Sequence, residues 1–464
     1  MTNSLSPAAV HLTEKVQKNA HRRALRYLCL TVFLLMSAPR LRVQLGPIPL
    51  YLIDLPLLLT AYFAMQVPKI RRLPLGGAVV VILAAAFVSE VSAGVRMGTL
   101  SEPLYLIGRT FLAGSLFFSA RRIVNSERAF QAVVKAALLG AIITSILMIT
   151  TSLPQTRGLV LDHVFSQPYL EPASEGVTSK YGDTYQGVAA RGRSLVGVSI
   201  LSAAFLNTIW PLLFLMRRQQ SLGRAWRLLL ILAAVLIPIA VVMSYSRGAI
   251  LGLLLIIIMV LFFNTRRVRQ PLVLGIGVAL LIFYWVGWDS DYFFFERIEG
   301  SMQSALEDPY NNISVTERLF AYHEPFQHLI DHPEFLFVGQ GFARSRVSGH
   351  TLTAGMDAAT HAAFAASYYG YGLFAALTYV VLLLRALWIT VRHIYQPENE
   401  FASSYSRALF AGMMGFLSWF LLGHAAVSQP RGAMLLFLVF GLVAAQPGLS
   451  VLPKAVKRAQ ERRP

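Results

Sequence analysis

Long apolar stretches recur along the chain and alternate with short polar segments. Many of them approach or exceed the ~20 residues that cross a bilayer as an α-helix, and runs of this length predict membrane-spanning helices. We therefore predict an all-α polytopic membrane protein, with residues 1–464 forming a single integral membrane domain. The sequence predicts about twelve transmembrane helices, at residues 24–38, 47–67, 75–93, 103–120, 129–152, 195–216, 227–244, 247–263, 271–288, 361–391, 405–425 and 429–447.

The seventh and eighth predicted helices form one continuous apolar run. A single helix through 227–263 would be about 54 Å long at about 1.5 Å per residue, which is much longer than a hydrocarbon core of about 30 Å. Two helices in a tight hairpin fit better, with the segment "SYSRG" supplying the turn. This arrangement places Arg247 at the membrane surface.

Composition and charge support this interpretation and give it an orientation. Of the 464 residues, 55% are hydrophobic and 14% are charged, more apolar surface than a soluble protein of this length could bury. Lys and Arg concentrate in alternate short connections, such as "KIRR" and "TRRVR". The positive-inside rule then predicts cytoplasmic N- and C-termini. The net charge of +18 is thus a topology signal, with anionic membrane lipid rather than nucleic acid as its partner.

Two predicted outer connections are long, at residues 153–194 and 289–360. The larger one contains an amphipathic helix within "TERLFAYHEPFQHLIDHPEF", ending at the "DHP" triplet. Long loops commonly carry function, so the working surface is predicted to lie outside the cytoplasmic membrane.

Arginines at this outer surface are candidate phosphate ligands, because a guanidinium group matches phosphate oxygens and keeps its charge. Arg247 begins a helix, whose free N–H groups also favour anions. Arg191 and Arg193 precede the sixth predicted helix, against the inside-positive trend. For each of these three, an ordinary interfacial arginine that snorkels to water is the alternative. The further candidate substrate-binding residues are Arg318, Arg344 and Tyr245.

His361 opens the tenth predicted helix, and a histidine at the membrane boundary has the pKa range of a general base. An interfacial or packed histidine is the alternative. The glycines Gly370 and Gly372 of the same helix allow close packing against another helix. Asp54 and Arg109 carry opposite charges at similar predicted depth in the second and fourth helices. They are expected to form a buried structural pair.

Two groups of side chains resemble metal sites, but we expect no metal. His323, His328 and His332 lack an obvious further ligand, and "DHP" is typical of a helix terminus. The acidic residues of "DSD", at 289–291, are interpreted as loop charges. We likewise expect no cofactor.

Four segments together resemble the O-antigen ligase and O-antigen polymerase superfamily of bacterial surface-polysaccharide enzymes. "SYSRGAILGL" is similar to its Ser-Arg-Gly hairpin, and "RGRSLVG" to its earlier arginine segment. "ERLFAYHEPFQHLIDHPEFLFVGQGF" resembles its arginine-containing outer helix, and "THAAFAASYYGYGLFAAL" its histidine-starting helix. The order of the segments and the predicted layout also fit.

The resemblance implies a membrane glycosyltransferase C-like fold in the bacterial inner membrane, with the active site facing the periplasm. It implies a donor glycan carried on undecaprenyl diphosphate and transfer without a metal ion. Arg247 and either Arg193 or Arg191 would hold the diphosphate. His361 would orient or deprotonate the acceptor hydroxyl.

Three activities remain open at the level of sequence. A polymerase would join lipid-linked repeat units into O-antigen or exopolysaccharide, with a chain-length regulator as a candidate partner. A ligase would transfer the finished glycan to lipid A-core or another acceptor. The substantial outer loops favour the polymerase, as does Ala362, which follows His361 where ligases of the family usually have Asn, Ser or Gln. A flippase is the third possibility, although the chain shows no repeated halves.

Overall fold

The computed structural model describes most of the chain but not all of it. The described residues are 7–45, 48–68, 74–165, 194–196, 199–217, 223–244, 246–263, 327, 330–343, 363–397, 400–422 and 430–449. Within them the longer helices are α1 (Pro7–Ser37), α2 (Asp54–Gln66), α3 (Gly76–Met97), α4 (Ser101–Ile123), α5 (Glu127–Ser152), α8 (Ser199–Ile209), α10 (Arg224–Val242), α11 (Arg247–Phe263), α17 (Ala363–Tyr395), α18 (Glu400–Leu422) and α19 (Pro430–Leu449). The shorter elements are α6 (Pro154–Val160), α9 (Leu212–Arg217), a π-helical turn (Leu161–Phe165), a 3₁₀ turn (Pro333–Phe335) and the antiparallel strands β1 (Arg42–Leu45) and β2 (Ile48–Tyr51).

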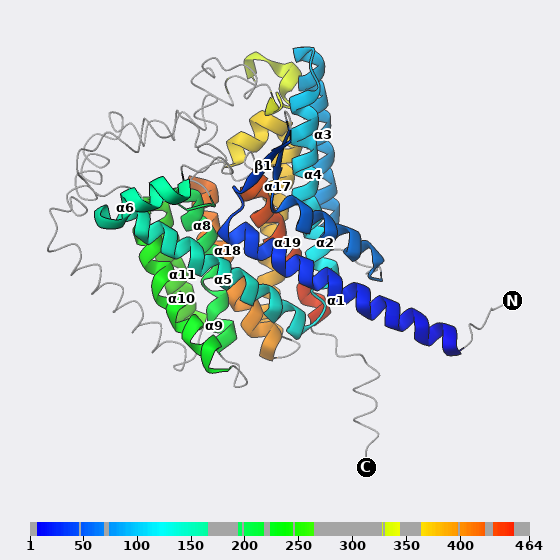
Figure 1. Cartoon of the computed structure of the whole chain (residues 1–464). Coiled ribbons are helices and arrows are strands. Elements are labelled where there is room, and N and C mark those ends of the chain that lie inside the picture. The colour runs from blue at the N-terminus through cyan, green and yellow to red at the C-terminus, as the bar shows by residue number, and fades with distance from the viewer. Residues whose placement is uncertain are drawn as a thin grey trace.

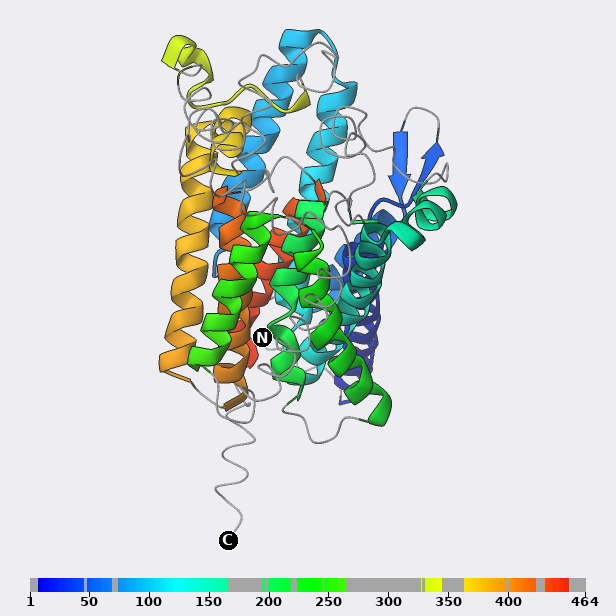
Figure 2. The same ribbon diagram turned by 90° about the vertical axis from the view of Figure 1, so that its left-hand side faces the viewer.

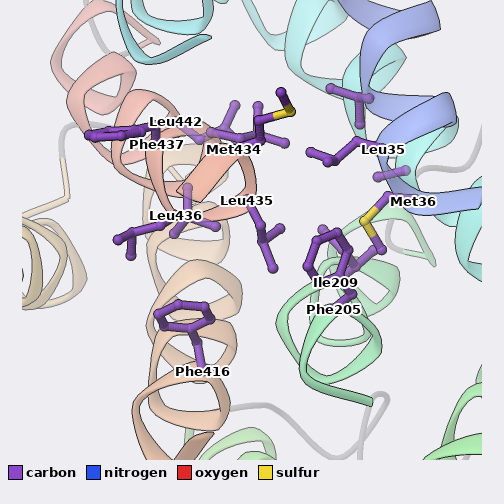
Figure 3. Close-up of a cluster of buried hydrophobic side chains, with 14 of the residues drawn as sticks. Leu35, Met36, Phe205, Ile209, Phe416, Met434, Leu435, Leu436, Phe437 and Leu442 are labelled. Atoms are coloured by element: carbon purple, nitrogen blue, oxygen red, sulfur yellow. The ribbon is translucent and has the colours of Figure 1, made fainter. Parts of the chain in front are cut away.

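Most of the longer helices run side by side in one bundle around α19 (Figures 1 and 2). Every residue of α19 from Gly432 to Gln446 is buried, as expected for a helix that is apolar on all sides. Figure 3 shows Leu435 and Phe437 of α19 in a cluster with Met36 of α1, Phe205 of α8 and Phe416 of α18. The core is therefore built around α19, the last helix that the structure describes.

Four of the described helical segments are long and apolar enough to cross a membrane, namely Gly76–Met97, Glu127–Ser152, Arg224–Val242 and Ala366–Tyr395. Shorter apolar segments include Gly248–Phe263 and Arg431–Gln446. Large apolar side chains such as Trp388 of α17, which is 67% exposed, face outward. An all-α membrane architecture is therefore confirmed at this level.

Eleven of the twelve predicted transmembrane segments overlap described helices, and the remaining one, 271–288, lies outside the described residues. The predicted hairpin at "SYSRG" is confirmed, because α10 ends at Val242 and α11 begins at Arg247. The helical prediction for the start of segment 47–67 was wrong. Strand β2 occupies Ile48–Tyr51 and pairs with β1, and α2 begins only at Asp54.

Two other predicted helices are interrupted. Segment 195–216 divides into α8 and α9 at Trp210 and Pro211, since proline removes a helical hydrogen bond. Helix α17 contains a kink at Gly372, which has a φ of 83°. Such values favour glycine, so this residue sets the position of the kink.

The two predicted long loops are described only in part. Loop 153–194 begins with α6 and the π-helical turn, and residues 166–193 lie outside the described part. In loop 289–360 the structure describes residue 327 and residues 330–343. The predicted helix end at "DHP" agrees with the 3₁₀ turn that follows helical residues 330 and 331.

Candidate functional site

One end of the bundle carries the β1–β2 hairpin, the α10–α11 turn and the N-terminus of α17 (Figures 1 and 2). We call it the hairpin end. The described segments that adjoin most of the predicted site residues in the sequence lie at this end. The candidate site is therefore sought at the hairpin end.

Two serines shape the α10–α11 turn. The Ser244 hydroxyl donates to the Val241 carbonyl over 2.6 Å and accepts the Ser246 amide over 3.2 Å. The Ser246 hydroxyl then accepts the Ala249 amide at 3.4 Å, so it caps the N-terminus of α11. This cap makes Arg247 the first residue of α11, next to amides that favour an anion. The Arg247 side chain and all of Tyr245 lie outside the described part.

The short segment 194–196 fixes the chain directly after Arg193. The hydroxyl groups of Ser194 and Ser202 are 2.8 Å apart, and the Ser194 hydroxyl accepts the Val196 amide over 3.1 Å. Arg431, in the first turn of α19, donates to the Val196 carbonyl over 3.2 Å. Arg193 therefore directly precedes, in the sequence, a segment that contacts α8 and α19. Arg191 and Arg193 themselves lie outside the described residues.

Arg431 also lies near two further arginines, Arg40 and Arg109. These three arginines, together with Tyr51, Asp54 and Tyr105, form what we call the arginine cluster. Within it, Arg431 interacts electrostatically with both Arg40 and Arg109 and with the two tyrosines. The Arg109 guanidinium stands 4.5 Å from the centre of the Tyr51 ring. Sequence reasoning missed Arg40 and Arg431, although Arg431 directly follows a short outer connection and opens an apolar segment.

The predicted pair of Asp54 and Arg109 is confirmed as a buried ion pair. Its predicted depth in the second helix was wrong, because Asp54 is the first residue of α2. There its other carboxylate oxygen accepts the Tyr51 amide over 2.9 Å, which joins β2 to α2. Asp54 offsets one of the three arginine charges, so the six residues of the cluster carry two positive charges in excess. Such a place favours anions.

Residues 335–343 form a second feature of this end, which we call the docked loop. The loop contacts α17 through backbone hydrogen bonds: the Gln340 amide donates to the Tyr369 carbonyl and the Gly341 amide to the Gly370 carbonyl, each over 2.9 Å. The Leu373 amide donates to the Leu336 carbonyl over 2.8 Å. The kink of α17 therefore supplies backbone groups that hold the loop.

Glycines make this close contact possible. A Cβ atom added at Gly370 would clash with the ring of Phe342, and one at Gly372 would clash with the Phe337 carbonyl. The predicted close approach at these two glycines is present, but the partner is the docked loop and not another helix. Gly339 and Gly341 of the loop also have positive φ values, of 73° and 76°.

Helix α3 holds the docked loop from the other side. Glu90 is fully buried, and its two carboxylate oxygens accept the amides of Phe342 and Ala343 over 2.8 and 3.1 Å. Arg96 donates to the Gln340 carbonyl over 3.1 Å and lies 4.4 Å from the centre of the Phe335 ring. Sequence reasoning missed Glu90, although an acidic residue inside a predicted membrane helix is a signal of function.

Two of the remaining predicted site residues adjoin the docked loop and α17 in the sequence. Ala343 directly precedes Arg344, and α17 begins two residues after His361. Arg318, Arg344 and His361 themselves lie outside the described residues. The structure thus describes the chain directly next to Arg344 and close to His361. That the predicted site side chains lie close to one another stays a prediction.

The metal hypotheses gain no support from the described part of the chain. No group of three His, Cys, Asp or Glu side chains suited to a metal ion occurs there. His332 is half-exposed and lies 3.3 Å from the Glu334 carboxylate. His323, His328 and the "DSD" segment lie outside the described residues.

The described part of the fold defines a helical membrane protein whose hairpin end carries an arginine cluster and, separately, a glycine-held loop. Residues 228–380 match the family model described as O-antigen ligase. The match covers about a third of the chain, and it supports the resemblance of this region to the O-antigen ligase and O-antigen polymerase superfamily, whose members are glycosyltransferase-like enzymes. It contains Tyr245, Arg247, Arg318, Arg344 and His361, and it does not extend to Arg191 or Arg193. No match to a curated protein was found.

Proposed function

We propose that the protein is a polymerase that joins undecaprenyl-diphosphate-linked oligosaccharide repeat units into O-antigen or exopolysaccharide. It acts at the outer face of the bacterial inner membrane, with both termini in the cytoplasm. The supporting family match gives the general class, a glycosyltransferase-like enzyme acting on a lipid-linked glycan and an acceptor. The substrate and the direction of transfer are our inference.

The observation that carries this proposal is the arginine cluster at the hairpin end. Arg431 contacts the segment directly after Arg193, and Arg247 begins α11 at the same end of the bundle. A diphosphate carries several negative charges on adjacent oxygens, and a concentration of guanidinium groups suits it. We therefore place the diphosphate of the donor between the arginine cluster, Arg193 and Arg247.

The proposed reaction needs a charge stabiliser and a base. The acceptor hydroxyl oxygen bonds to the anomeric carbon of the donor sugar, and the bond from that carbon to the diphosphate oxygen breaks. The diphosphate leaves with the electron pair, and fixed arginines stabilise its growing negative charge more in the transition state than before it. His361 accepts the proton of the acceptor hydroxyl. No step of this scheme requires a metal ion.

A ligase is the second candidate, and the description of the matching family model favours it. It would use the same donor site and the same arginines. Its acceptor would be lipid A-core or another glycan rather than a second lipid-linked repeat unit. The two activities differ only in the acceptor that reaches His361.

Reconstitution tests the proposal. Purified protein in liposomes is given lipid-linked oligosaccharide in the presence of a metal chelator, and the glycans are separated by length. The polymerase proposal predicts a ladder of longer lipid-linked glycans. Transfer that occurs only when lipid A-core is added would identify the ligase. Movement of the donor across the bilayer without a new glycosidic bond would contradict both and indicate a flippase.

A further inference from the structure

A cavity of about 370 Å³ lies on the surface of α1 and α2, far from the site proposed above. It is lined by Arg23, Arg26, Tyr27 and Leu30 of α1 and by Phe63 of α2. Both arginines are exposed, and they lie three residues apart, which puts them on the same face of the helix. The cavity therefore combines two positive charges with an aromatic and aliphatic wall.

The wall of the cavity is a preformed aromatic pair. The rings of Tyr27 and Phe63 stack with centroids 5.5 Å apart and an angle of 2° between their planes. The Arg23 guanidinium stands 5.9 Å from the centre of the Phe63 ring. A cation held over an aromatic face remains free to bind an anion on its other side. The pair thus supports Arg23 in a position where its charge faces the cavity.

No acidic residue lies near this site along the two helices that form it. Between Lys18 and Asp54 the sequence contains neither Asp nor Glu, and Asp54 is at the far end of α2. Among the residues that the structure describes, neither Arg23 nor Arg26 forms an ion pair with a carboxylate. The excess positive charge of the cavity therefore favours an anionic occupant.

The cavity lies at the end of the α1–α2 pair opposite the β-hairpin. The two helices run antiparallel, because Thr31 contacts Thr60 through hydroxyl groups 3.2 Å apart while Tyr27 stacks on Phe63. Hence Arg23 lies beside the last turn of α2, where the chain enters the segment "KIRR". On the orientation that the charge pattern predicts, this is the cytoplasmic interface, where anionic lipids gather.

Exposed apolar side chains border the cavity on α1 and also cover the outer face of α2. Leu30 of α1 is 45% exposed, and Leu55, Leu58, Tyr62 and Met65 form an exposed stripe on α2 with helical spacing. Acyl chains can pack on Leu30 and on the Tyr27–Phe63 pair while a headgroup occupies the cavity. A free phosphate ion would use the arginines alone and would leave the apolar surface uncovered.

We propose that Arg23 and Arg26 bind the phosphate of an anionic phospholipid in the cytoplasmic leaflet, with the Tyr27–Phe63 pair and Leu30 contacting its acyl chains. The inference does not depend on the proposed transferase activity. The bound lipid would pack α2 against α1 and thereby stabilise the two helices that lead to Asp54 and the arginine cluster.

The experiment measures lipid retention by the full chain. Wild type and the Arg23→Ala/Arg26→Ala variant are reconstituted in nanodiscs of phosphatidylcholine with increasing phosphatidylglycerol. Retained lipid is counted by native mass spectrometry, and the unfolding midpoint is recorded. We expect phosphatidylglycerol to be retained and to raise the midpoint of the wild type. In the variant the apparent affinity should fall at least about tenfold, because the direct charge-assisted hydrogen bonds of both arginines to the phosphate are lost.

Arg22→Ala is the matched control. Arg22 is also exposed on α1 and does not line the cavity, so its loss should leave retention unchanged. Equal retention by the double variant and Arg22→Ala would overturn the proposal. The proposal would also be overturned if inorganic phosphate raised the unfolding midpoint as much as phosphatidylglycerol does, or if undecaprenyl phosphate were retained in preference to phosphatidylglycerol. Photo-crosslinking of phosphatidylglycerol to wild-type α1 and α2 tests the same site without a variant, and crosslinks confined to other helices would contradict it.

Discussion

At the scale of single residues, the hairpin end depends on a few charges that are buried or crowded. Asp54 joins the end of the β-hairpin to α4 through the Tyr51 amide and Arg109. Arg431 joins α19 to the segment after Arg193 and lies within the field of two other arginines. These charges have different roles in our account: the Asp54–Arg109 pair holds the structure, and Arg431 contributes to donor binding.

The Asp54→Asn variant tests the structural role. It should lower the free energy of unfolding by about 3 kcal/mol, because a buried arginine that loses its carboxylate is left uncompensated. The unfolding midpoint of the purified variant measures the effect. Adding Arg109→Gln should restore part of the loss, since the uncompensated charge is then removed. Additive losses in the double variant would show that the two residues act independently.

The Arg431→Ala variant tests the role in donor binding. We expect the KM for the lipid-linked donor to rise at least about tenfold, since a charge-assisted hydrogen bond to phosphate is lost. Arg431→Lys should recover part of the affinity. Arg385→Ala is the matched control, because Arg385 is exposed on α17 and remote in sequence from the cluster. An unchanged donor KM in Arg431→Ala would show that Arg431 does not bind the donor and only holds the Val196 carbonyl.

At the scale of elements, the docked loop is held between α3 and the kink of α17. Glu90, Arg96 and the carbonyl groups of Tyr369 and Gly370 all bind its backbone. The loop leads directly to Arg344, and the kinked helix begins next to His361. These elements therefore hold the chain next to two predicted site residues.

The Gly372→Ala variant should release the docked loop. The new methyl group would clash with the Phe337 carbonyl, and alanine is disfavoured at a φ of 83°. Hydrogen exchange at the amides of Gln340 and Gly341 should accelerate at least about tenfold, with a loss of glycan transfer. Gly108→Ala is the control, because a methyl group at Gly108 meets nothing within 4 Å. Unchanged protection in Gly372→Ala would show that the kink does not hold the loop.

The Glu90→Gln variant tests the same loop from α3. Glutamine keeps one acceptor oxygen but replaces the other with an amide that donates, so one of the two loop amides loses its partner. Exchange at the amides of Phe342 and Ala343 should accelerate by about tenfold, and transfer should slow in parallel. If Glu90→Asp restores transfer without restoring protection, the carboxylate has a role beyond holding the loop.

At the scale of the whole molecule, much of the helical layout could be predicted from the sequence, because apolar runs of membrane-crossing length dominate it. The β-hairpin was missed, since "VQLGPIPLYL" is as apolar as the helix that follows and only its Gly-Pro turn marks the strands. The Asp54–Arg109 pair followed from opposite charges in apolar surroundings. The contacts of Glu90 and Arg431 join residues more than 200 positions apart and could not be predicted from local pattern.

Orientation is a property of the whole molecule and can be tested by cysteine labelling in a Cys29→Ser background. Leu159 of α6 is 66% exposed at the hairpin end, and Arg227 lies in the first turn of α10 at the opposite end. Leu159→Cys should react with a membrane-impermeant maleimide in spheroplasts, and Arg227→Cys only after permeabilisation. The reverse pattern would place the proposed site in the cytoplasm and contradict its access to an outer-face donor.

The central claim is that arginines and a histidine at the hairpin end transfer a glycan from a lipid diphosphate. The most direct measurement is the rate of glycan lengthening in liposomes by wild type, Arg247→Ala, Arg247→Lys and His361→Ala at equal protein content. We predict loss of product in both alanine variants and substantial impairment in Arg247→Lys, because lysine cannot bind phosphate oxygens in the bidentate manner of arginine. Normal lengthening by both Arg247→Ala and His361→Ala would contradict the account.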